Sequence, residues 1–402
     1  MVEEKAAALS LSKIAYWPNF SASSSEGVDR SLTSSAADPL YDADTHFSHP
    51  HIELDMTLTL VDFGFRAATK RSAREALASA YALHDDALRE TILEGAQAYY
   101  ALLKAASTEE SDRELEASAT RLRDAVSGRY RGGVALLTEE LQAETSLSDL
   151  VLKRIAAQGD RKTARAALAV LIGIDADGDY VIAPDNNEYT HIQDLQGIHD
   201  LLADALREDS KVRSAEADLR TAQADLDLER ARNLPTLSLG VTSMYAAQHY
   251  YGSNEFSIYE NNANNAQRTN EVSLQVQIPL TDLASRHYSI KSAQANVEVK
   301  WNDLETARRQ VAVAVWDAYQ KLDVSNQSLG VAQQMLETAR QLYEVTEGRY
   351  FAGAGSLIDV LNAQRDLETA RSRQVNAIFD LQLARLTLLA SIGQLNLPGV
   401  QP

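Results

Sequence analysis

Cysteine is absent from this sequence of 402 residues. Without thiols the chain forms no disulfide and no thiolate metal site, and it carries no lipidated N-terminal cysteine. The sequence also lacks any run of about 18 apolar residues, so we expect no transmembrane helix. Residues 1–5 do not lead into an apolar core of the length that a secretory signal needs, so we expect no export signal here.

Basic and aromatic residues are both scarce. Aromatics make up 6% of the chain and apolar residues 45%, so the interior must rely on alanine and leucine, which suit closely packed helices. There are 57 acidic against 38 basic residues, a formal net charge of −19. Nucleic-acid binding needs clustered positive charge. We therefore expect no nucleic acid among the partners.

Catalytic motifs are missing too. The sequence contains no Ser-His-Asp set, no phosphate-binding glycine loop and no H-E-x-x-H motif. We predict that the protein is not an enzyme and that it uses no cofactor.

Two polar stretches contain residue types that bind metals. Histidine and carboxylate side chains suit transition metals, but we interpret residues 42–51 as a polar outer loop. Residues 175–179 resemble a calcium loop, but their glycine is in the fourth position instead of the sixth, and Asn186 stands where the loop needs a glutamate. We interpret them as a turn and predict no metal site. The candidate ligands in the first stretch are Asp42, Asp44, His46, His49 and His51.

One stretch of the chain occurs twice. Residues 347–361 and residues 127–141 align without a gap at a distance of 220 residues. Each copy contains Gly-Arg-Tyr, then small residues, then the start of a helical pattern. Glycine supplies the positive φ that ends a helix, and Ser356 is a suitable N-cap for the helix that follows. Two matching helical hairpins indicate a duplicated chain.

Long helical patterns flank both copies. The first, residues 66–130, contains no proline and would extend roughly 95–100 Å at ~1.5 Å per residue. Two shorter helices, 136–171 and 199–233, match its length when they are placed end to end. The second half repeats the order with helices over 286–350 and 357–392. A long rod beside two shorter rods forms the wall of a cylinder, so we predict a helical tunnel.

Alternating apolar and polar residues predict strands before each long helix. The clearest strand is 52–60, where Ile, Leu and Met alternate with Glu, Asp and Thr. Residues 237–242 and 272–278 show the same alternation, and residues 19–25 are a weaker candidate. Four strands cannot close a barrel, and open strand edges are not tolerated in a bilayer. Several chains must share one barrel, and three copies would give a 12-stranded barrel.

This layout resembles the TolC family of trimeric outer-membrane channel proteins of Gram-negative bacteria. The resemblance rests on Arg-Tyr-x-x-Gly followed by Leu-Ile-Asp-Val-Leu-Asn-Ala-Gln-Arg at 357–365, on the counterpart at 129–143, and on the strand-to-helix junctions at 60–64 and 279–282. It covers nearly the whole chain. It implies a mixed fold of two tandem repeats, an α-helical tunnel plus a β-barrel, with four strands per protomer and a homotrimer in the outer membrane.

The resemblance also implies what the protein does. It would be the exit duct of a tripartite efflux pump or a type I secretion system, with outer-membrane lipid around the barrel. Small molecules or proteins would arrive from a periplasmic adaptor protein and an inner-membrane pump of the RND, ABC or MFS class. The alternative is a periplasmic coiled-coil scaffold or adaptor without a channel, which explains the long helices but not the four alternating strands.

The resemblance divides the chain into eight segments. They are a shortened tunnel helix at 1–17, two barrel strands with their outer loop at 18–61, the first tunnel hairpin at 62–172, an equatorial segment at 173–198, a tunnel helix at 199–233, two more barrel strands with their outer loop at 234–280, the second tunnel hairpin at 281–392, and a C-terminal equatorial segment at 393–402.

At the narrow end of such a tunnel the resemblance implies a pore constriction. Three copies of Asp359 would form a carboxylate ring that selects cations, and Glu139 holds the matching position in the first hairpin. The family has an arginine and a second aspartate where this chain has Gly355 and Asn362, so one ring is incomplete. Tyr350 would either latch neighbouring hairpins through its phenol or pack at the helix end. For the acidic residues, the alternative role is to stabilise the helix dipole.

Small residues at the two tips would let a helical partner approach closely. We expect these residues to contact the adaptor, with plain turn chemistry as the alternative. They are Gly132, Gly133, Val134, Ala135, Gly353, Ala354, Gly355, Ser356 and Leu357.

Overall fold

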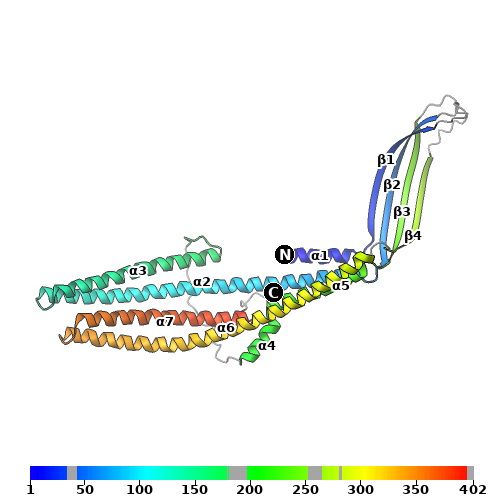
Figure 1. Cartoon of the computed structure of the whole chain (residues 1–402). Helices are drawn as coiled ribbons and strands as arrows, with labels where there is room; N and C mark the ends of the chain where they lie inside the picture. Colours follow the sequence, from blue (N-terminus) through cyan, green and yellow to red (C-terminus); the bar gives the residue numbers. More distant parts are fainter. Residues whose placement is uncertain (34–42, 179, 181–196, 252–264, 280–282, 396–402) are drawn as a thin grey trace. The chain divides into compact units, whose positions relative to one another are not determined.

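The computed structural model describes the chain except residues 34–42, 179, 181–196, 252–264, 280–282 and 396–402. The chain forms two compact units (Figure 1). The first combines residues 1–81 and 214–304, and the second combines residues 82–213 and 305–402. None of the described helices is both long enough and apolar enough to cross a membrane.

The first unit contains an antiparallel four-stranded sheet in the order β1-β2-β3-β4. The prediction of two strands before each long helix is confirmed. Within the described chain β1 and β4 each have one edge without a paired strand (Figure 1). The strands are β1 (Asn19–Thr33), β2 (Ala43–Val61), β3 (Thr236–Tyr251) and β4 (Asn265–Gln277).

The register gives this sheet one apolar and one polar face, because side chains alternate between the two faces along a strand. On the apolar face Leu58 is paired with Leu239, and Leu239 is paired with Leu274. On the polar face Asp55 is paired with Thr242, whose hydroxyl donates to the Asp55 carboxylate at 2.7 Å. Leu274 is 69% exposed. The apolar face is therefore still open within the described chain.

β1 and β2 are longer than the sequence pattern predicted. We predicted residues 26–33 and 43–51 as part of a polar loop, but they continue the two strands and pair with each other. Residues 26–33 contain Glu, Gly and Asp, and residues 43–51 contain Asp, Pro and three histidines, so their local strand preference is weak. A partner strand supplies the backbone hydrogen bonds, and such pairing overrides local preference.

The histidines of the predicted loop therefore lie on a strand. His51 Nδ1 is 2.8 Å from the hydroxyl of Ser25, and His49 Nε2 is 3.3 Å from the carboxylate of Asp29. No group of three or more metal-binding side chains occurs in the part of the chain that the structure describes. Asp42 lies outside the described residues.

The junction from β2 into the first long helix lies within 60–64, where it was predicted. Asp62 accepts a hydrogen bond from the backbone N–H of Arg66 at 3.1 Å and so caps the helix. Phe63 and Gly64 both have positive φ, which turns the chain sharply. The matching junction includes residues 280–282, which lie outside the described residues. The first unit also holds α1 (Val2–Ile14), most of α5 (Ser210–Arg232) and the beginnings of α2 (Phe65–Arg131) and α6 (Leu283–Phe351).

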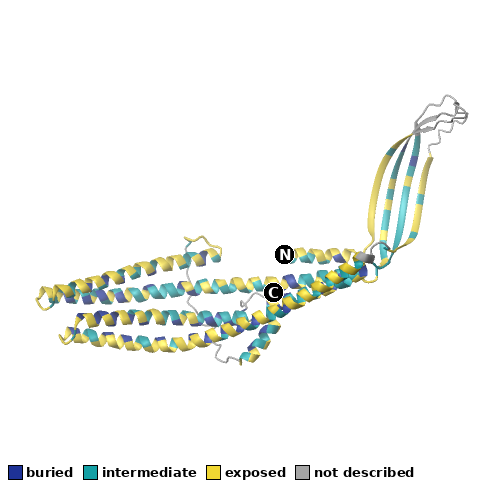
Figure 2. Ribbon diagram, in the orientation of Figure 1, coloured by how far each residue is buried: buried dark blue, intermediate teal, exposed yellow. Residues whose placement is uncertain are grey.

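The second unit is built on two helical hairpins, α2 with α3 (Leu137–Leu171) and α6 with α7 (Leu357–Ser391). Side chains from both hairpins share one core, which includes Leu122 of α2 and Val360 of α7. Buried and exposed residues alternate along these helices in Figure 2, as expected of helices that pack on one side. The two predicted hairpins are confirmed.

The predicted helix over 199–233 is wrong in one respect, because it is two helices, α4 (Ile198–Glu208) and α5. The backbone of Asp209 between them is extended, with φ −67° and ψ 133°. The Asp209 carboxylate accepts from the backbone N–H of Lys211 at 2.8 Å. Aspartate favours an N-cap over a helix interior. It therefore starts a new helix at a place where the apolar periodicity shows no interruption.

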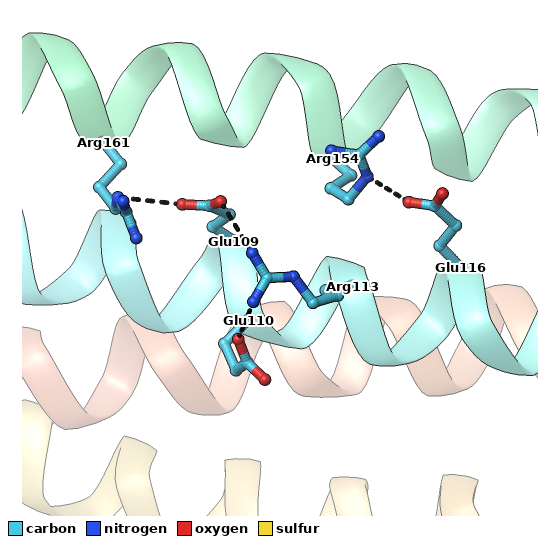
Figure 3. A network of polar contacts seen from close by, with 6 residues as sticks. All are labelled: Glu109, Glu110, Arg113, Glu116, Arg154 and Arg161. Carbon is cyan, nitrogen blue, oxygen red and sulfur yellow. Dashed lines mark hydrogen bonds and ion pairs between the residues drawn. The ribbon is translucent and has the colours of Figure 1, made fainter.

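Charged residues join α2 to α3 (Figure 3). The Glu109 side chain is 4% exposed and lies 3.0 Å from Arg161 of α3 and 3.4 Å from Arg113 of its own helix. About two turns further along, Glu116 pairs with Arg154. A nearly buried carboxylate is stable only when it is paired. The network therefore favours this alignment of the two helices.

Candidate functional site: the hairpin tips

Both hairpins turn in the same way. Gly133 has φ 71° and Gly353 has φ 75°. In the second tip the N–H of Gly353 donates to the carbonyl of Tyr350 at 3.0 Å, and the N–H of Ala354 donates to that of Arg349 at 2.9 Å. The first tip repeats both bonds, a Schellman ending that glycine favours. A Cβ at either glycine would meet no atom within 4 Å, so the positive φ, and not crowding, selects glycine.

The helices after the two tips begin differently. Ser356 caps α7 through its hydroxyl, which accepts from the N–H of Asp359 at 3.3 Å, as predicted. Leu136 holds the same position before α3 and makes no side-chain capping bond. The first turn of α3 instead carries two carboxylates, Glu139 and Glu140, which favour the positive end of the helix dipole.

Both tips present apolar side chains at their surface. Val134 is 70% exposed, Leu136 is 68% exposed, and Ile358 is 54% exposed. Clustered apolar side chains on a surface often mark an interaction site. Of the tip residues predicted to contact an adaptor, only Leu357 is buried, with 1% of its surface exposed. As a correction, its side chain packs in the core and does not belong to the tip surface.

Tyr350 connects the two hairpins. It is 3% exposed, and its hydroxyl donates to Glu139 of α3 at 3.2 Å. The guanidinium of Arg129 lies 4.7 Å from the ring centroid and donates to the Tyr350 carbonyl at 2.9 Å. Burial raises the pKa of the Tyr350 phenol, and the charge of Glu139 raises it further, so the phenol keeps the proton that it donates. Hydrogen bonding and packing, the two alternatives for this residue, both occur.

Asp359 and Asn362 are exposed on the first two turns of α7. They line a hollow of about 240 Å³ together with Arg349 and Asp366. Glu139 does not share this hollow, because its carboxylate lies against Tyr350. The four residues predicted at a constriction therefore form two pairs, one partly buried between the hairpins and one open on α7.

Two ion pairs between the hairpins were not evident in the sequence. Lys153 of α3 lies 2.6 Å from Glu368 of α7 and 2.9 Å from Asp149 of its own helix. Arg371 of α7 lies 2.8 Å from Glu114 of α2. These residues are far apart in the chain and follow no repeated motif, so no pattern indicated them.

A third contact was also missed, although a signal for it exists. Tyr343 is 6% exposed, and its hydroxyl lies 3.2 Å from that of Ser118 in the first hairpin. Tyr343 precedes Tyr350 by seven residues, a spacing that places both phenols on one side of α6. The role of Arg129 also had a signal in the sequence, because Arg129 belongs to the repeated Gly-Arg-Tyr motif.

A groove of about 660 Å³ lies between α3 and α7 near the tips, and Leu141, Ser146 and Gln364 are among its lining residues. Gln364 is 3% exposed, and neither atom of its amide has a hydrogen-bond partner within the described residues. A buried amide without a partner costs about 1–3 kcal/mol. Gln364 is therefore a buried polar residue of the second hairpin whose burial destabilises the fold.

Comparison with known proteins identifies relatives over nearly the whole chain. The family model described as outer membrane efflux protein matches residues 2–174 and 201–394. Protein CyaE of Bordetella pertussis is 29% identical over 395 residues, which cover 98% of this chain and 80% of CyaE. Outer membrane protein TolC of Vibrio cholerae is 22% identical over 389 residues, 97% of this chain and 85% of that protein. The solved structure of CusC superposes with a TM-score of 0.82 at 18% identity and covers 98% of this chain and 87% of CusC.

Proposed function

Because the chain belongs to the family of outer membrane efflux proteins, we propose that it forms, as a homotrimer, the exit duct of a tripartite efflux pump or a type I secretion system. It is a protein of the outer membrane, with a tunnel that extends into the periplasm. In this role it receives small molecules or proteins from a periplasmic adaptor and an inner-membrane pump. The family is one of channel proteins, and we propose no covalent chemistry on this chain.

The observation that carries the proposal is the two-faced sheet with two open edges. A sheet with an apolar outer face suits lipid, but unpaired strand edges are not tolerated in a bilayer. If three copies pair β4 of one with β1 of the next, every edge is paired and the count of strands fits the outer-membrane range. A scaffold without a channel would leave both the apolar face and the edges without a role.

For the gate, we propose that the tips form the constriction of the closed duct. Asp359 and Asn362, exposed on α7, would face the pore, and three copies of Asp359 would concentrate negative potential there. Glu139 and Tyr350 would hold the second hairpin against the first, because their hydrogen bond joins α3 to α6. Opening would then require this partly buried hydrogen bond to break.

For the partner, the exposed tip residues suit a helical adaptor. Val134, Leu136 and Ile358 offer apolar area, and the adjacent glycines allow a close approach. Val134→Asp should abolish export while the trimer still assembles, as measured by cargo release from cells and by native mass spectrometry. Loss of the trimer in this variant would instead assign the tip to folding.

The membrane role is tested by two arginine substitutions on neighbouring residues of β4. Leu274→Arg places a charge on the apolar face and should cost roughly 2–4 kcal/mol near the bilayer midplane. Gln275→Arg places the same charge on the polar face and should be tolerated. The measurement is the yield of heat-modifiable trimer in the outer membrane. Equal yields for the two variants would contradict the assignment of the faces and with it the duct.

A further inference from the structure

An arginine lies on the apolar face of the sheet. Arg268 of β4 is paired with Tyr245 of β3, and Tyr245 is paired with Ile52 of β2. Along β4 Arg268 shares its face with Val272 and Leu274, because all three are separated by even numbers of residues. Arg268 is exposed, and Tyr245 is 47% exposed.

The position of Arg268 along the strand matches the edge of a lipid-facing band. Ile278, which is 55% exposed, is the first apolar residue of this face beside the helix junction. Ten residues separate it from Arg268, roughly 33 Å along a strand at ~3.3 Å per residue. At a strand tilt of ~40° this corresponds to a height of roughly 25 Å, the usual height of the apolar band. Arg268 therefore lies at the rim farthest from the helices.

The charges of the sheet are unevenly divided between its faces. Among the strand residues whose side chains are described, the polar face carries Asp29, Glu53, Asp55 and Glu271, and no lysine or arginine. The apolar face carries Glu26 and Arg30 of β1 in addition to Arg268. Arg268 makes no ion pair with a described residue. An arginine that faces lipid is costly unless its charge reaches the interface and meets an anion there.

We propose that Arg268 and Tyr245 bind the phosphate of a lipid headgroup at the outer rim of the apolar band. The guanidinium presents a planar fork of donors that fits two phosphate oxygens, and the phenol offers a further donor beside it. An exposed pair on the lipid-facing side favours a lipid over free phosphate. This inference rests on the proposed function, because it needs the sheet to be in a membrane.

The test is the retention of phosphatidylglycerol by the trimer, measured by native mass spectrometry after transfer from mixed phosphatidylglycerol and phosphatidylcholine nanodiscs. Arg268→Gln should weaken retention roughly tenfold, because charge-assisted hydrogen bonds are lost. Arg268→Lys should retain part of the binding, and Tyr245→Phe should lose less than Arg268→Gln. Arg340→Gln, which removes another exposed arginine, this one from α6, should change nothing.

Each alternative has its own outcome. Equal retention by the parent and Arg268→Gln trimers would overturn the site. If a low concentration of inorganic phosphate displaced the lipid, the ligand of this site would be a free anion and not a lipid headgroup, which would overturn the proposal. If Glu26→Gln abolished retention as Arg268→Gln does, an ion pair between copies would replace the headgroup site. A parent protein that forms no trimer in nanodiscs would overturn the proposed function, and this site with it.

Discussion

The two hairpins have the same turns and the same length of second helix, yet different interactions hold them. The first hairpin carries Glu109 with Arg161 and Glu116 with Arg154 between its helices. At the positions 220 residues further along, the second hairpin has leucine in place of Glu109, Arg161 and Glu116 and glutamine in place of Arg154. The fold of a hairpin therefore does not require ion pairs at these positions. The features kept in both copies are those of the tip, the Gly-Arg-Tyr ending and its positive-φ glycine.

The two hairpins also differ in how many large apolar side chains they bury. α7 contributes residues such as Leu357, Val360 and Leu367 to the shared core, whereas α3 contributes fewer large ones. Partly exposed ion pairs add little stability individually, because water screens them. We infer that the second hairpin supplies most of the apolar burial between the two.

The largest expected effect comes from two leucines at equivalent positions of the tips. Leu357→Ala removes a side chain that is 1% exposed and should destabilise the protein by about 2–5 kcal/mol, because it leaves a cavity. Leu137→Ala, its match in the first hairpin, removes a side chain that is 51% exposed and should change stability by less than about 0.5 kcal/mol. Denaturant unfolding of both variants measures the contrast. Equal losses would show that the hairpins are packed alike.

The second prediction concerns variants in which residues of the first hairpin are replaced by those at the equivalent positions of the second hairpin. Glu109→Leu alone leaves Arg161 and Arg113 without their shared carboxylate and should destabilise the protein by up to about 1 kcal/mol, because both arginines remain about half exposed to water. The double variant Glu109→Leu with Arg161→Leu places leucine at both positions, as in the second hairpin, and should recover most of the loss. Thermal unfolding at fixed salt measures both variants. If the double variant were less stable than the single one, the two hairpins would not be equivalent at these positions.

Gln364 provides an effect of the opposite sign. It stands where the first hairpin has Glu144, whose carboxylate pairs with Arg123 at 3.4 Å. Gln364→Leu removes a buried amide without a partner and should stabilise the protein by up to about 1 kcal/mol. The matched change Glu144→Leu on the first hairpin should not stabilise, because it removes a paired group. If Gln364→Leu lowered the melting temperature, the amide must have a partner in solution.

The smallest effect depends on pH. Burial raises the pKa of Asp112, and the charge of Glu368 raises it further although Lys153 opposes this. A carboxyl with a raised folded pKa binds its proton more readily in the folded state, so its contribution favours folding as the pH falls through that pKa. Asp112→Asn should therefore be more stable than the parent at neutral pH, and the difference should shrink toward acid pH. Melting curves across this range give the sign, and a variant less stable than the parent at neutral pH would contradict it.

The sequence predicted the features that are local. The tip turns follow from glycine at a positive-φ position, and the cap of α7 follows from Ser356, three residues before the N–H that it binds. The bond between Tyr350 and Glu139 joins residues 211 apart. The repeated tip motif singled out each of these two residues. Their contact could not be predicted, because it depends on how the two hairpins pack against each other. The break at Asp209 escaped prediction because the helical pattern around its capping bond is unbroken. The extension of β1 escaped prediction because residues 26–33 show no clear alternation, and their strand depends on pairing with β2.

We propose that this chain forms a trimeric duct with an acidic constriction at its tips. Conductance of the purified protein in a planar bilayer tests this proposal most directly, with the parent compared to Asp359→Asn and to Glu139→Gln. We expect discrete conductance steps that favour cations, with the preference reduced most by Asp359→Asn because its carboxylate is the exposed one. A protein that inserts as a trimer but conducts no ions would contradict the duct, and an unchanged ion preference in Asp359→Asn would contradict the constriction.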